Sequence, residues 1–392
     1  MKKLLIVASA DTIFITNYVR ALKLEMDVEV HVYSPFPPVG NYTSYPYDYV
    51  YFEDNIVFRS RLLNKVSFLL TPFVFRKRLS SFLKQHNCRY DYIHFHRILP
   101  SWVLRIDEYK RYAEKVILTF WGGEIDVEHI LFSKTLYMKK LDKLVKSSDA
   151  VANPFSDKRY FDYFPILRQK GFEAVYGSSI IDCINKLQIL PEDAKSRLSI
   201  ASESITVMIG YSGKRIHNHI PIIESIFANP NYCKNKDRLH LIISMTRGGS
   251  EDYIREIISI LNEGEVKYTI ISGGYSSDED VAILRRATDF VFQLSDFDGV
   301  SSSIKECLCA GSIVITGNWL PYNMLKSQGF VYPEVSGIDE GIEVFYELLN
   351  RYPSCKDDYS CNRLLANAKF SWDACIKDWV DLYMRKNNVE VL

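Results

Sequence analysis

The sequence lacks the features that mark several classes of protein. Its 392 residues carry no net charge, because 48 lysines and arginines balance 48 aspartates and glutamates, so no overall field attracts the chain to nucleic acid. Its eight cysteines contain no C-x-x-C pair, which favours reduced thiols over a disulfide framework or a zinc site. No apolar run approaches the roughly 20 residues that cross a bilayer, and the apolar start ends too early for a signal peptide. We therefore expect a cytoplasmic protein, either soluble or peripheral to a membrane.

What the sequence does contain is a regular alternation of short β-branched runs and helical patterns. This alternation is typical of βαβ units whose parallel sheets are buried on both faces. Strands are expected at 2–8, 27–33, 91–95, 115–120 and 149–152, and again at 205–210, 239–245, 267–272, 289–293 and 313–316. The length is about twice that of a single core. The prediction is an α/β protein with two Rossmann-like, doubly wound domains that face each other across a cleft.

A polar stretch between the two series of strands indicates the domain boundary. It contains glycine, serine, proline and a short charged helix, which is the composition of a linker with few crossing contacts. We expect an N-terminal domain at 1–176, a linker at 177–204, a second domain at 205–370 and a closing segment at 371–392. Ligands of such sheets bind beyond the carboxyl ends of the strands, so the informative residues should follow strands.

One segment, residues 55–90, combines basic and apolar residues and has no acid. Its basic residues are Arg59, Arg61, Lys65, Arg76, Lys77, Arg78, Lys84 and Arg89. This composition suits an interfacial element attracted to an anionic membrane surface. The alternative is a core-facing helix with a solvated cationic face, and the same two interpretations apply to the basic run at 134–146.

The most specific pattern follows the strand that ends at residue 293. Asp298 precedes a predicted helix that begins with Ser301, Ser302 and Ser303 and continues through Glu306. The N-terminus of a helix exposes unpaired N–H groups that bind phosphate, and serine hydroxyls add donors there. The two carboxylates can accept hydrogen bonds from the vicinal hydroxyls of a sugar or ribose.

Two further loops supply positive charge at strand ends of the second domain. Gly213, Lys214 and Arg215 follow the first strand, and Arg247 follows the second. A diphosphate that leaves during a reaction needs cationic and N–H donors of this kind. Lys214 and Arg215 can alternatively form an ordinary solvated turn.

In the first domain, acids and histidines follow strands. Glu124 and Asp126 follow the strand near residue 120 and are our candidates for a base that accepts the proton of an acceptor hydroxyl. They could instead cap the helix that comes next. His94, His96 and Asp11 are candidates for contact with the acceptor, although a histidine at a strand end can equally be a core or rim residue.

The segment from Asp298 to Glu306 resembles the E-x7-E motif of family-4-type glycosyltransferases with the GT-B fold, with aspartate in place of the first glutamate. Further similar segments are 3–7 with 16–19, the D-x-I-H-x-H strand at 91–96, the loop at 120–126, and 370–373 followed by Tyr383. The resemblance implies that Glu306 binds the ribose of a nucleotide donor and that Asp298 lies near the transferred sugar. It also implies that 371–392 forms a helix that crosses back to the first domain.

The implied function is metal-independent transfer of a sugar from a nucleotide-diphosphate donor to a lipid-linked saccharide. Similar proteins assemble bacterial O-antigen, capsule or common antigen at the inner face of the cell membrane. A retaining reaction is favoured, but Asn218-His219 and the loop at 245–249 resemble inverting fucosamine-type transferases. We expect no cofactor and no metal, although Asp296-Phe297-Asp298 also spells the metal-binding D-x-D signature of another fold.

Two other functions stay open, and two departures from the family pattern motivate the second of them. The arginine that the family places directly after Gly210 is missing, and Asp298 replaces a glutamate. A nucleotide-sugar epimerase with the same fold is one alternative. A non-catalytic, transferase-like subunit that serves as a partner or membrane scaffold is the other.

Overall fold

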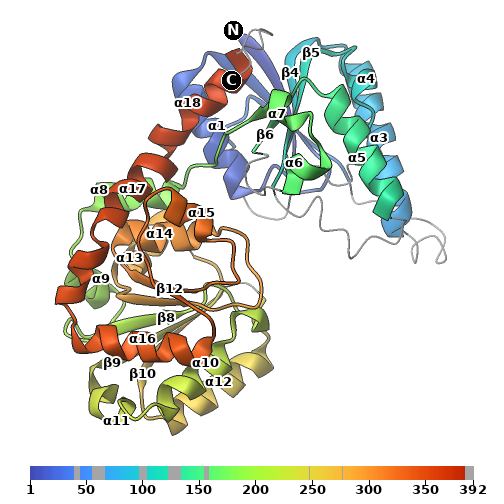
Figure 1. Ribbon diagram of the computed structural model, residues 1–392. Helices are drawn as coiled ribbons and strands as arrows, with labels where there is room; N and C mark the ends of the chain where they lie inside the picture. Colours follow the sequence, from blue (N-terminus) through green and yellow to red (C-terminus); the bar gives the residue numbers. More distant parts are fainter. Residues whose placement is uncertain are drawn as a thin grey trace. The chain divides into compact units, whose positions relative to one another are not determined.

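The computed structural model describes residues 1–38, 45–54, 67–96, 104–121, 134–153, 159–246, 248–275 and 277–384. The chain divides into two compact units (Figure 1). The first unit contains Met1–Gly177 and Cys375–Leu392, and the second contains Ser178–Ala374. Each unit has a parallel sheet of its own, which confirms the α/β class and the two Rossmann-like domains.

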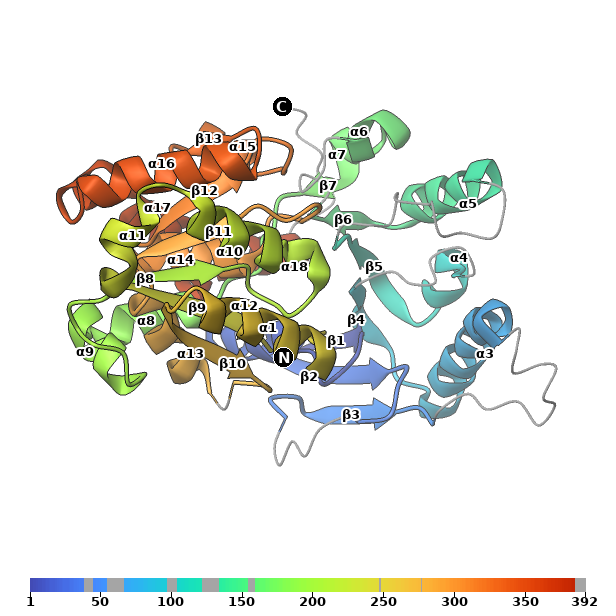
Figure 2. The same ribbon diagram turned by 90° about the horizontal axis from the view of Figure 1, so that it is seen from below.

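The first unit is built on a seven-stranded parallel sheet, whose strands lie in a row in Figure 2. Their order is β3-β2-β1-β4-β5-β6-β7. Their bounds are β1 Lys2–Val7, β2 Val28–Ser34, β3 Tyr49–Phe52, β4 Tyr90–His96, β5 Ala113–Thr119, β6 Ala150–Ala152 and β7 Gly171–Phe172. The order reverses between β1 and β4, which creates the crevice where sheets of this type bind ligands.

Helices cover both faces of this sheet (Figure 1). They are α1 Ile13–Glu25 and α18 Trp372–Met384 on one face, α3 Ser67–His86, α4 Ile106–Tyr109 and α5 Lys134–Ser147 on the other, and the short α6 Arg159–Tyr163 and α7 Leu167–Lys170. In α3, Phe75, Leu79, Phe82 and Leu83 are buried in the core. Residues 71–90 of the basic segment therefore have the core-facing arrangement, while 55–66 lie outside the described residues.

The second unit has a six-stranded parallel sheet with the order β10-β9-β8-β11-β12-β13. The bounds are β8 Ile205–Ile209, β9 Leu239–Met245, β10 Lys267–Ser272, β11 Phe290–Gln293, β12 Ile313–Gly317 and β13 Glu334–Val335. Every strand expected here is present to within a residue. The strand order reverses between β8 and β11, so the ligand edge of this sheet lies where these two strands end.

Two layers of helices pack on the second sheet (Figure 1). One layer is α10 His219–Ala228, α12 Glu251–Glu263 and α16 Ile338–Asn350; the other contains α8 Ser179–Leu187, α9 Pro191–Arg197, α13 Asp278–Arg286, α14 Ser302–Ala310 and α17 Cys361–Phe370. Short helices α11 Tyr232–Asn235 and α15 Asn323–Ser327 connect strands. The segment 177–204, which composition marks as a linker, forms α8 and α9 on α13 because Ile181, Ile184 and Ala194 are buried there.

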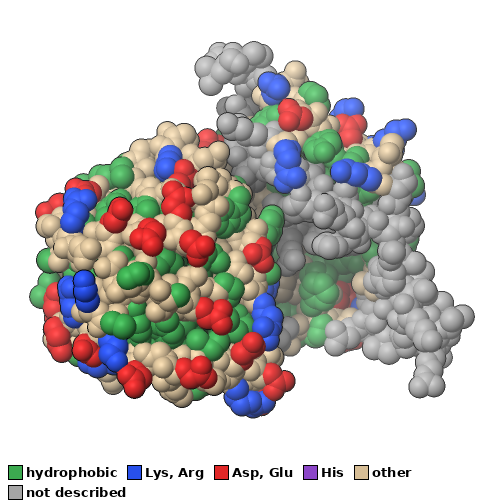
Figure 3. All heavy atoms as spheres, turned by 60° about the horizontal axis from the view of Figure 1, so that its bottom comes forward, with side chains coloured by type: hydrophobic (Ala, Val, Ile, Leu, Met, Phe, Trp, Pro, Cys, Tyr) green, Lys and Arg blue, Asp and Glu red, His purple; other side chains and the backbone are tan. Residues whose placement is uncertain are grey.

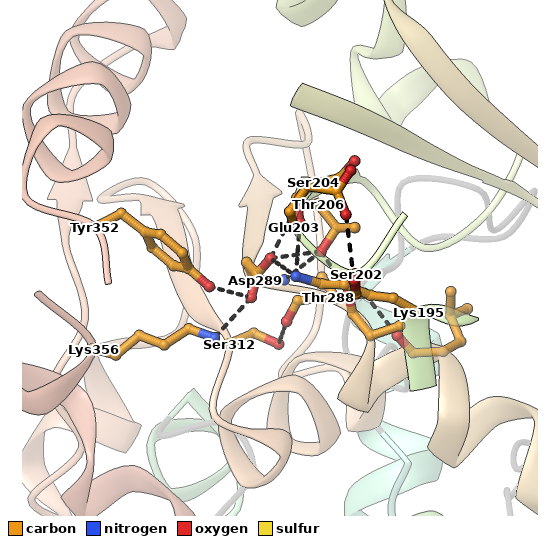
Figure 4. Close-up of polar contacts among 12 residues, drawn as sticks. Lys195, Ser202, Glu203, Ser204, Thr206, Thr288, Asp289, Ser312, Tyr352 and Lys356 are labelled. Atoms are coloured by element: carbon orange, nitrogen blue, oxygen red, sulfur yellow. Dashed lines mark hydrogen bonds and ion pairs between the residues drawn. The ribbon is translucent and has the colours of Figure 1, made fainter. Parts of the chain in front are cut away.

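A buried ion cluster closes the opposite, amino-terminal edge of this sheet (Figure 4). Asp289 directly precedes β11 and accepts hydrogen bonds from Lys195 and Lys356, each at 2.7 Å, and from Tyr352 at 2.6 Å. The backbone N–H of Thr206 also donates to it at 3.0 Å. Because Lys195 lies in α9, this cluster connects the segment 177–204, which was predicted to be a linker, to the sheet.

The surface and thiols agree with the composition. Acidic and basic side chains are interspersed over the face of the second unit seen in Figure 3. All eight cysteines are described and free. Of the helices that the structure describes, none combines the length and apolar character that a membrane span requires.

Candidate functional site

Residues from several loops meet at the ligand edge of the second sheet, where β8 and β11 end. Gly210 and Tyr211 follow β8, and the segment 294–298 follows β11. Asn218, at the end of the loop after β8, donates to the carbonyl of Leu294 at 2.9 Å and to the carboxylate of Asp296 at 2.8 Å. These contacts join the two loops into one structure.

Asp298 lies at the centre of a hydrogen-bond network in this edge. Tyr211 donates its hydroxyl to Oδ1 at 2.5 Å, and the amide of Gln293 donates to Oδ2 at 2.7 Å. Tyr322 also donates to Oδ2. Sequence reasoning did not identify Tyr211, Gln293 or Tyr322; only the positions of Tyr211 and Gln293 at strand ends could have indicated them.

The environment of Asp298 changes its proton affinity. The carboxylate is buried, and burial raises its pKa above the ordinary value for aspartate, although Tyr211 and Tyr322 oppose this by hydrogen bonding to the charged form. Burial, followed by the charge of Asp298, also raises the pKa of both tyrosines. At neutral pH the tyrosines are therefore neutral donors that hold the carboxylate in place.

The helix α14 begins beside this network. Ser301 is its N-cap, and its side chain accepts a hydrogen bond from the N–H of Ser303 at 3.2 Å. The N–H of Ser301 itself donates to the hydroxyl of Tyr322 at 3.4 Å. Other N–H groups of the first turn have no partner inside a helix, so the start of α14, with the hydroxyls of Ser302 and Ser303, can offer hydrogen-bond donors to an anion.

The loop after β8 depends on glycines. Gly210 has φ of +62°, and a Cβ there would lie 2.8 Å from the Cβ of His217. A Cβ on Gly213 would lie 2.5 Å from the backbone nitrogen of Gly249. Gly213 therefore allows the loops after β8 and β9 to touch, which is a packing role rather than a direct contact with a ligand.

Lys214 and Arg215, which were both predicted to bind a diphosphate, have different surroundings. Lys214 is exposed, its stem lies over Gly248, and it makes no ion pair with any described residue. Arg215 pairs with Glu256 at 2.9 Å and lies over the ring of Tyr253 at 4.1 Å. Of the two, only Arg215 forms an ion pair among the described residues.

His217 and His219 are two buried histidines at the end of the same loop, and sequence reasoning assigned neither of them a chemical role of its own. Nδ1 of His217 and Nε2 of His219 have no hydrogen-bond partner among the described residues. Burial lowers the pKa of His217 to about 4 and that of His219 to about 3, so both rings are neutral at pH 7. His219 Nδ1 contacts the hydroxyl of Tyr253 at 3.1 Å.

Glu306 lies in the middle of α14 and is buried. Its Oε2 pairs with Nε of Arg285 at 3.3 Å, and its Oε1 accepts the hydroxyl of Ser178 at 2.9 Å. Neither partner was predicted. A ribose hydroxyl that bonds to this carboxylate would have to replace Ser178 or share an oxygen with Arg285.

Comparison with known proteins identifies the fold. No protein-family model and no curated protein matches the chain. A sucrose-phosphate synthase from Thermosynechococcus elongatus has a TM-score of 0.72 at 14% identity, with 98% of each chain covered. HepE from Anabaena, in complex with UDP and glucose, has a TM-score of 0.65 at 14% identity, with 97% of this chain and 99% of that chain covered. A UDP-forming trehalose-phosphate synthase from Burkholderia xenovorans has a TM-score of 0.64 at 10% identity, with 99% of each chain covered.

The chain has the GT-B fold.

Its first unit contains the other predicted residues. Both ring nitrogens of His94 are occupied, by the hydroxyls of Tyr383 and Thr119, each at 2.6 Å. This GT-B chain therefore uses His94 to anchor α18, and the geometry favours the structural alternative over contact with an acceptor.

His96 and Asp11 lie at the ligand edge of the first GT-B sheet. His96 Nδ1 bonds to the hydroxyl of Tyr176, while its buried Nε2 has no partner among the described residues. Burial lowers the pKa of His96 to about 3. Tyr45 donates its hydroxyl to Asp11. Glu124, Asp126 and Arg247 lie outside the described residues.

Proposed function

We propose that this GT-B chain is a glycosyltransferase that uses a nucleotide-diphosphate sugar as donor. The supporting observation is the grouping, at one sheet edge, of the α14 N-terminus, the Asp298 network and Lys214, which has no ion pair with any described residue. The first two supply donors and positive charge for a diphosphate, and Glu306 supplies a carboxylate to the ribose. HepE, which shares the fold, binds UDP, glucose and UDP-glucose.

In this proposal the protein residues have distinct tasks. Lys214, the serines at 301–303 and the first-turn N–H groups stabilise the charge that develops on the leaving diphosphate. Asp298, which its tyrosine partners hold in place, would bind the sugar. Glu124 or Asp126 would face the acceptor, as a base in an inverting reaction and as a positioning group in a retaining one.

The finer proposal concerns the biological reaction. We propose a lipid-linked saccharide as acceptor, in the synthesis of a bacterial surface polysaccharide such as O-antigen, capsule or common antigen, by a retaining, metal-independent reaction. Among the described residues no three His, Cys, Asp or Glu side chains group in a way that could hold a metal ion. The test of metal independence is turnover in the presence of EDTA, which should equal turnover without it.

Isothermal titration with UDP, GDP, dTDP and UDP-glucose tests the proposal. At least one nucleotide should bind, and Lys214→Ala should weaken its binding. Absence of binding by all of these ligands would contradict the donor assignment. It would support the non-catalytic alternative, for which the aspartate in place of glutamate at 298 and the missing arginine after Gly210 are the grounds.

A nucleotide-sugar epimerase is distinguished by its independence of an acceptor. If the bound nucleotide sugar is converted without added saccharide or lipid, at a rate above slow hydrolysis, the epimerase is supported. If conversion requires membranes or saccharide, transfer is supported.

We further propose that the protein associates with the inner face of the cell membrane through residues 55–90. Vesicles that contain anionic lipid should sediment the protein at low salt and release it at high salt, because screening weakens the attraction of basic side chains to the surface. Protein that stays in the supernatant at every salt concentration would exclude this attachment.

A further inference from the structure

Trp319, two residues beyond the end of β12, is an exposed aromatic side chain held in one orientation. Its indole N–H donates to the carbonyl of Ser295 at 2.8 Å. Its ring lies against Gly317, where an added Cβ would be 2.4 Å from ring atoms. The side chain nevertheless remains 43% exposed. One part of the ring is therefore fixed against the protein and the rest is open.

Two more apolar side chains are joined to the same segment. Phe297, two residues after Ser295, is 68% exposed. The N–H of Asp296 donates to the carbonyl of Ile216 at 2.9 Å, and the side chain of Ile216 is 39% exposed. Loops that follow β8, β11 and β12 thus each present an apolar side chain, and they are joined by the indole N–H of Trp319, which donates to Ser295, and by the backbone bond between Asp296 and Ile216.

These side chains belong to the edge that carries Asp298. Asp298 is buried under its tyrosine and glutamine partners, whereas Phe297 beside it in sequence is open to solvent. An exposed, preoriented aromatic group loses little conformational freedom when it binds, which is why such groups act as anchors in recognition. Exposed apolar groups that gather at a ligand edge indicate a binding surface.

The polar neighbours decide which ligand fits. Asp296 and Asn318, which precede Phe297 and Trp319 in the sequence, are both exposed, and the carboxylate of Asp296 accepts the amide of Asn218 on one oxygen, which leaves the other for a ligand. A carboxylate accepts hydroxyl donors and repels phosphate, so Asp296 favours a neutral polyhydroxyl ligand over a nucleotide phosphate or an anionic lipid headgroup. A saccharide ring has an apolar face of C–H groups for the aromatic rings and hydroxyls at its edge for the polar groups.

We propose that Trp319 and Phe297 form an aromatic platform that binds a ring of the saccharide acceptor. This inference rests on the proposed transferase function and adds a subsite to it. Trp319 supplies the fixed surface, Phe297 covers a second part of the sugar, and Asp296 accepts a hydroxyl. The donor remains with Lys214, α14 and Glu306.

Saturation-transfer NMR tests the platform with maltotriose, cellotriose and chitotriose as probes, in the presence of UDP. At least one trisaccharide should receive saturation at its ring C–H protons from the wild-type protein. Trp319→Leu should abolish that signal, and Trp319→Phe, which keeps a ring without the N–H anchor, should reduce it. The control is Tyr163→Leu, because Tyr163 is also 43% exposed but belongs to the first unit; it should keep the signal.

The outcomes separate this inference from the proposed function. Equal thermal melting of Trp319→Leu and wild type shows that the variant is folded. If UDP binds and no trisaccharide receives saturation, or if Trp319→Leu keeps the signal, the platform is refuted while the donor site stands. If Trp319→Leu lowers the affinity for UDP itself, the ring contacts the nucleotide and the saccharide assignment is overturned. Failure of UDP and every other nucleotide to bind instead contradicts the proposed function.

Discussion

The hydroxyl of Ser178 donates a hydrogen bond to Oε1 of Glu306 across 2.9 Å. Ser178 is the first residue of the second unit, and its backbone N–H also donates to the carbonyl of Phe370 at 2.8 Å. The carboxylate proposed to bind ribose therefore already has a protein hydroxyl as partner. A ribose hydroxyl that takes this place must compete with Ser178.

Ser178→Ala should strengthen the binding of UDP, because the ribose no longer has to displace an internal donor. One hydrogen bond has a net value of about 0.5–1.5 kcal/mol, so the expected gain in affinity is about two- to tenfold. Isothermal titration of both proteins measures it, with pyrophosphate, which has no ribose, as the control ligand. Unchanged or weaker binding of UDP would mean that the ribose does not take the place of Ser178 on Oε1 of Glu306.

Lys214→Ala and Arg215→Ala should differ although the residues are neighbours. Lys214 is free of ion pairs among the described residues, whereas Arg215 is held by Glu256 and Tyr253. Loss of one charge-assisted contact to a diphosphate should lower the affinity for UDP by about tenfold in Lys214→Ala. The affinity should fall by clearly less in Arg215→Ala. Uridine, which carries no phosphate, should bind both variants alike. Equal losses in the two variants would contradict the assignment.

The buried carboxylate of Asp298 should make the folded protein less stable as the pH rises. Its pKa is raised in the folded protein, so the folded state binds the proton more tightly than the unfolded state, whose pKa is about 3.9. The free energy of unfolding of wild type should therefore fall relative to that of Asp298→Asn as pH increases above about 4, until the folded-state pKa is passed. Urea denaturation of both proteins across this range measures the difference. A difference that is constant, or that grows in favour of wild type, contradicts the buried-carboxylate explanation.

The sheets could be predicted from the sequence because buried parallel strands are continuous β-branched runs. β8 and β9 lie where Ile205–Ile209 and Leu239–Met245 predict them. The short edge strands β3, β7 and β13 were not predicted, since none of them is a run of fully buried residues, as the four-residue β11 is.

The partners of the predicted acids could not be found in the same way. Asp298 and Glu306 follow from local spacing, but Tyr322 and Ser178 reach them from positions 24 and 128 residues away. Such contacts depend on which loops the fold brings together, and one sequence does not contain that information. The linker prediction shows a related limit, because a polar composition at 177–204 concealed the few buried residues that pack α8 and α9 on α13.

Asp289→Asn should strongly destabilise the second unit. The carboxylate lies 2.7 Å from Nζ of Lys195, and the two side chains are only 1% and 5% exposed. Burial alone would raise the pKa of Asp289, but Lys356 and Lys195 lower it below the ordinary value, so its stabilising effect is present above about pH 4 and is lost as pH falls through the lowered pKa. Removing the charge leaves a buried ammonium unpaired, which costs about 3–5 kcal/mol.

Guanidinium denaturation at pH 7 measures this loss, and the exposed pair of Arg197 and Glu279 provides the matched control. Its side chains are 53% and 52% exposed at a separation of 3.0 Å. Glu279→Gln should change the free energy of unfolding by less than about 1 kcal/mol, because water already screens that pair. Lys356→Met should be intermediate, since Lys356 is 28% exposed and its removal leaves Asp289 paired with Lys195. If Asp289→Asn is no less stable than Glu279→Gln, the cluster does not hold this edge of the sheet together.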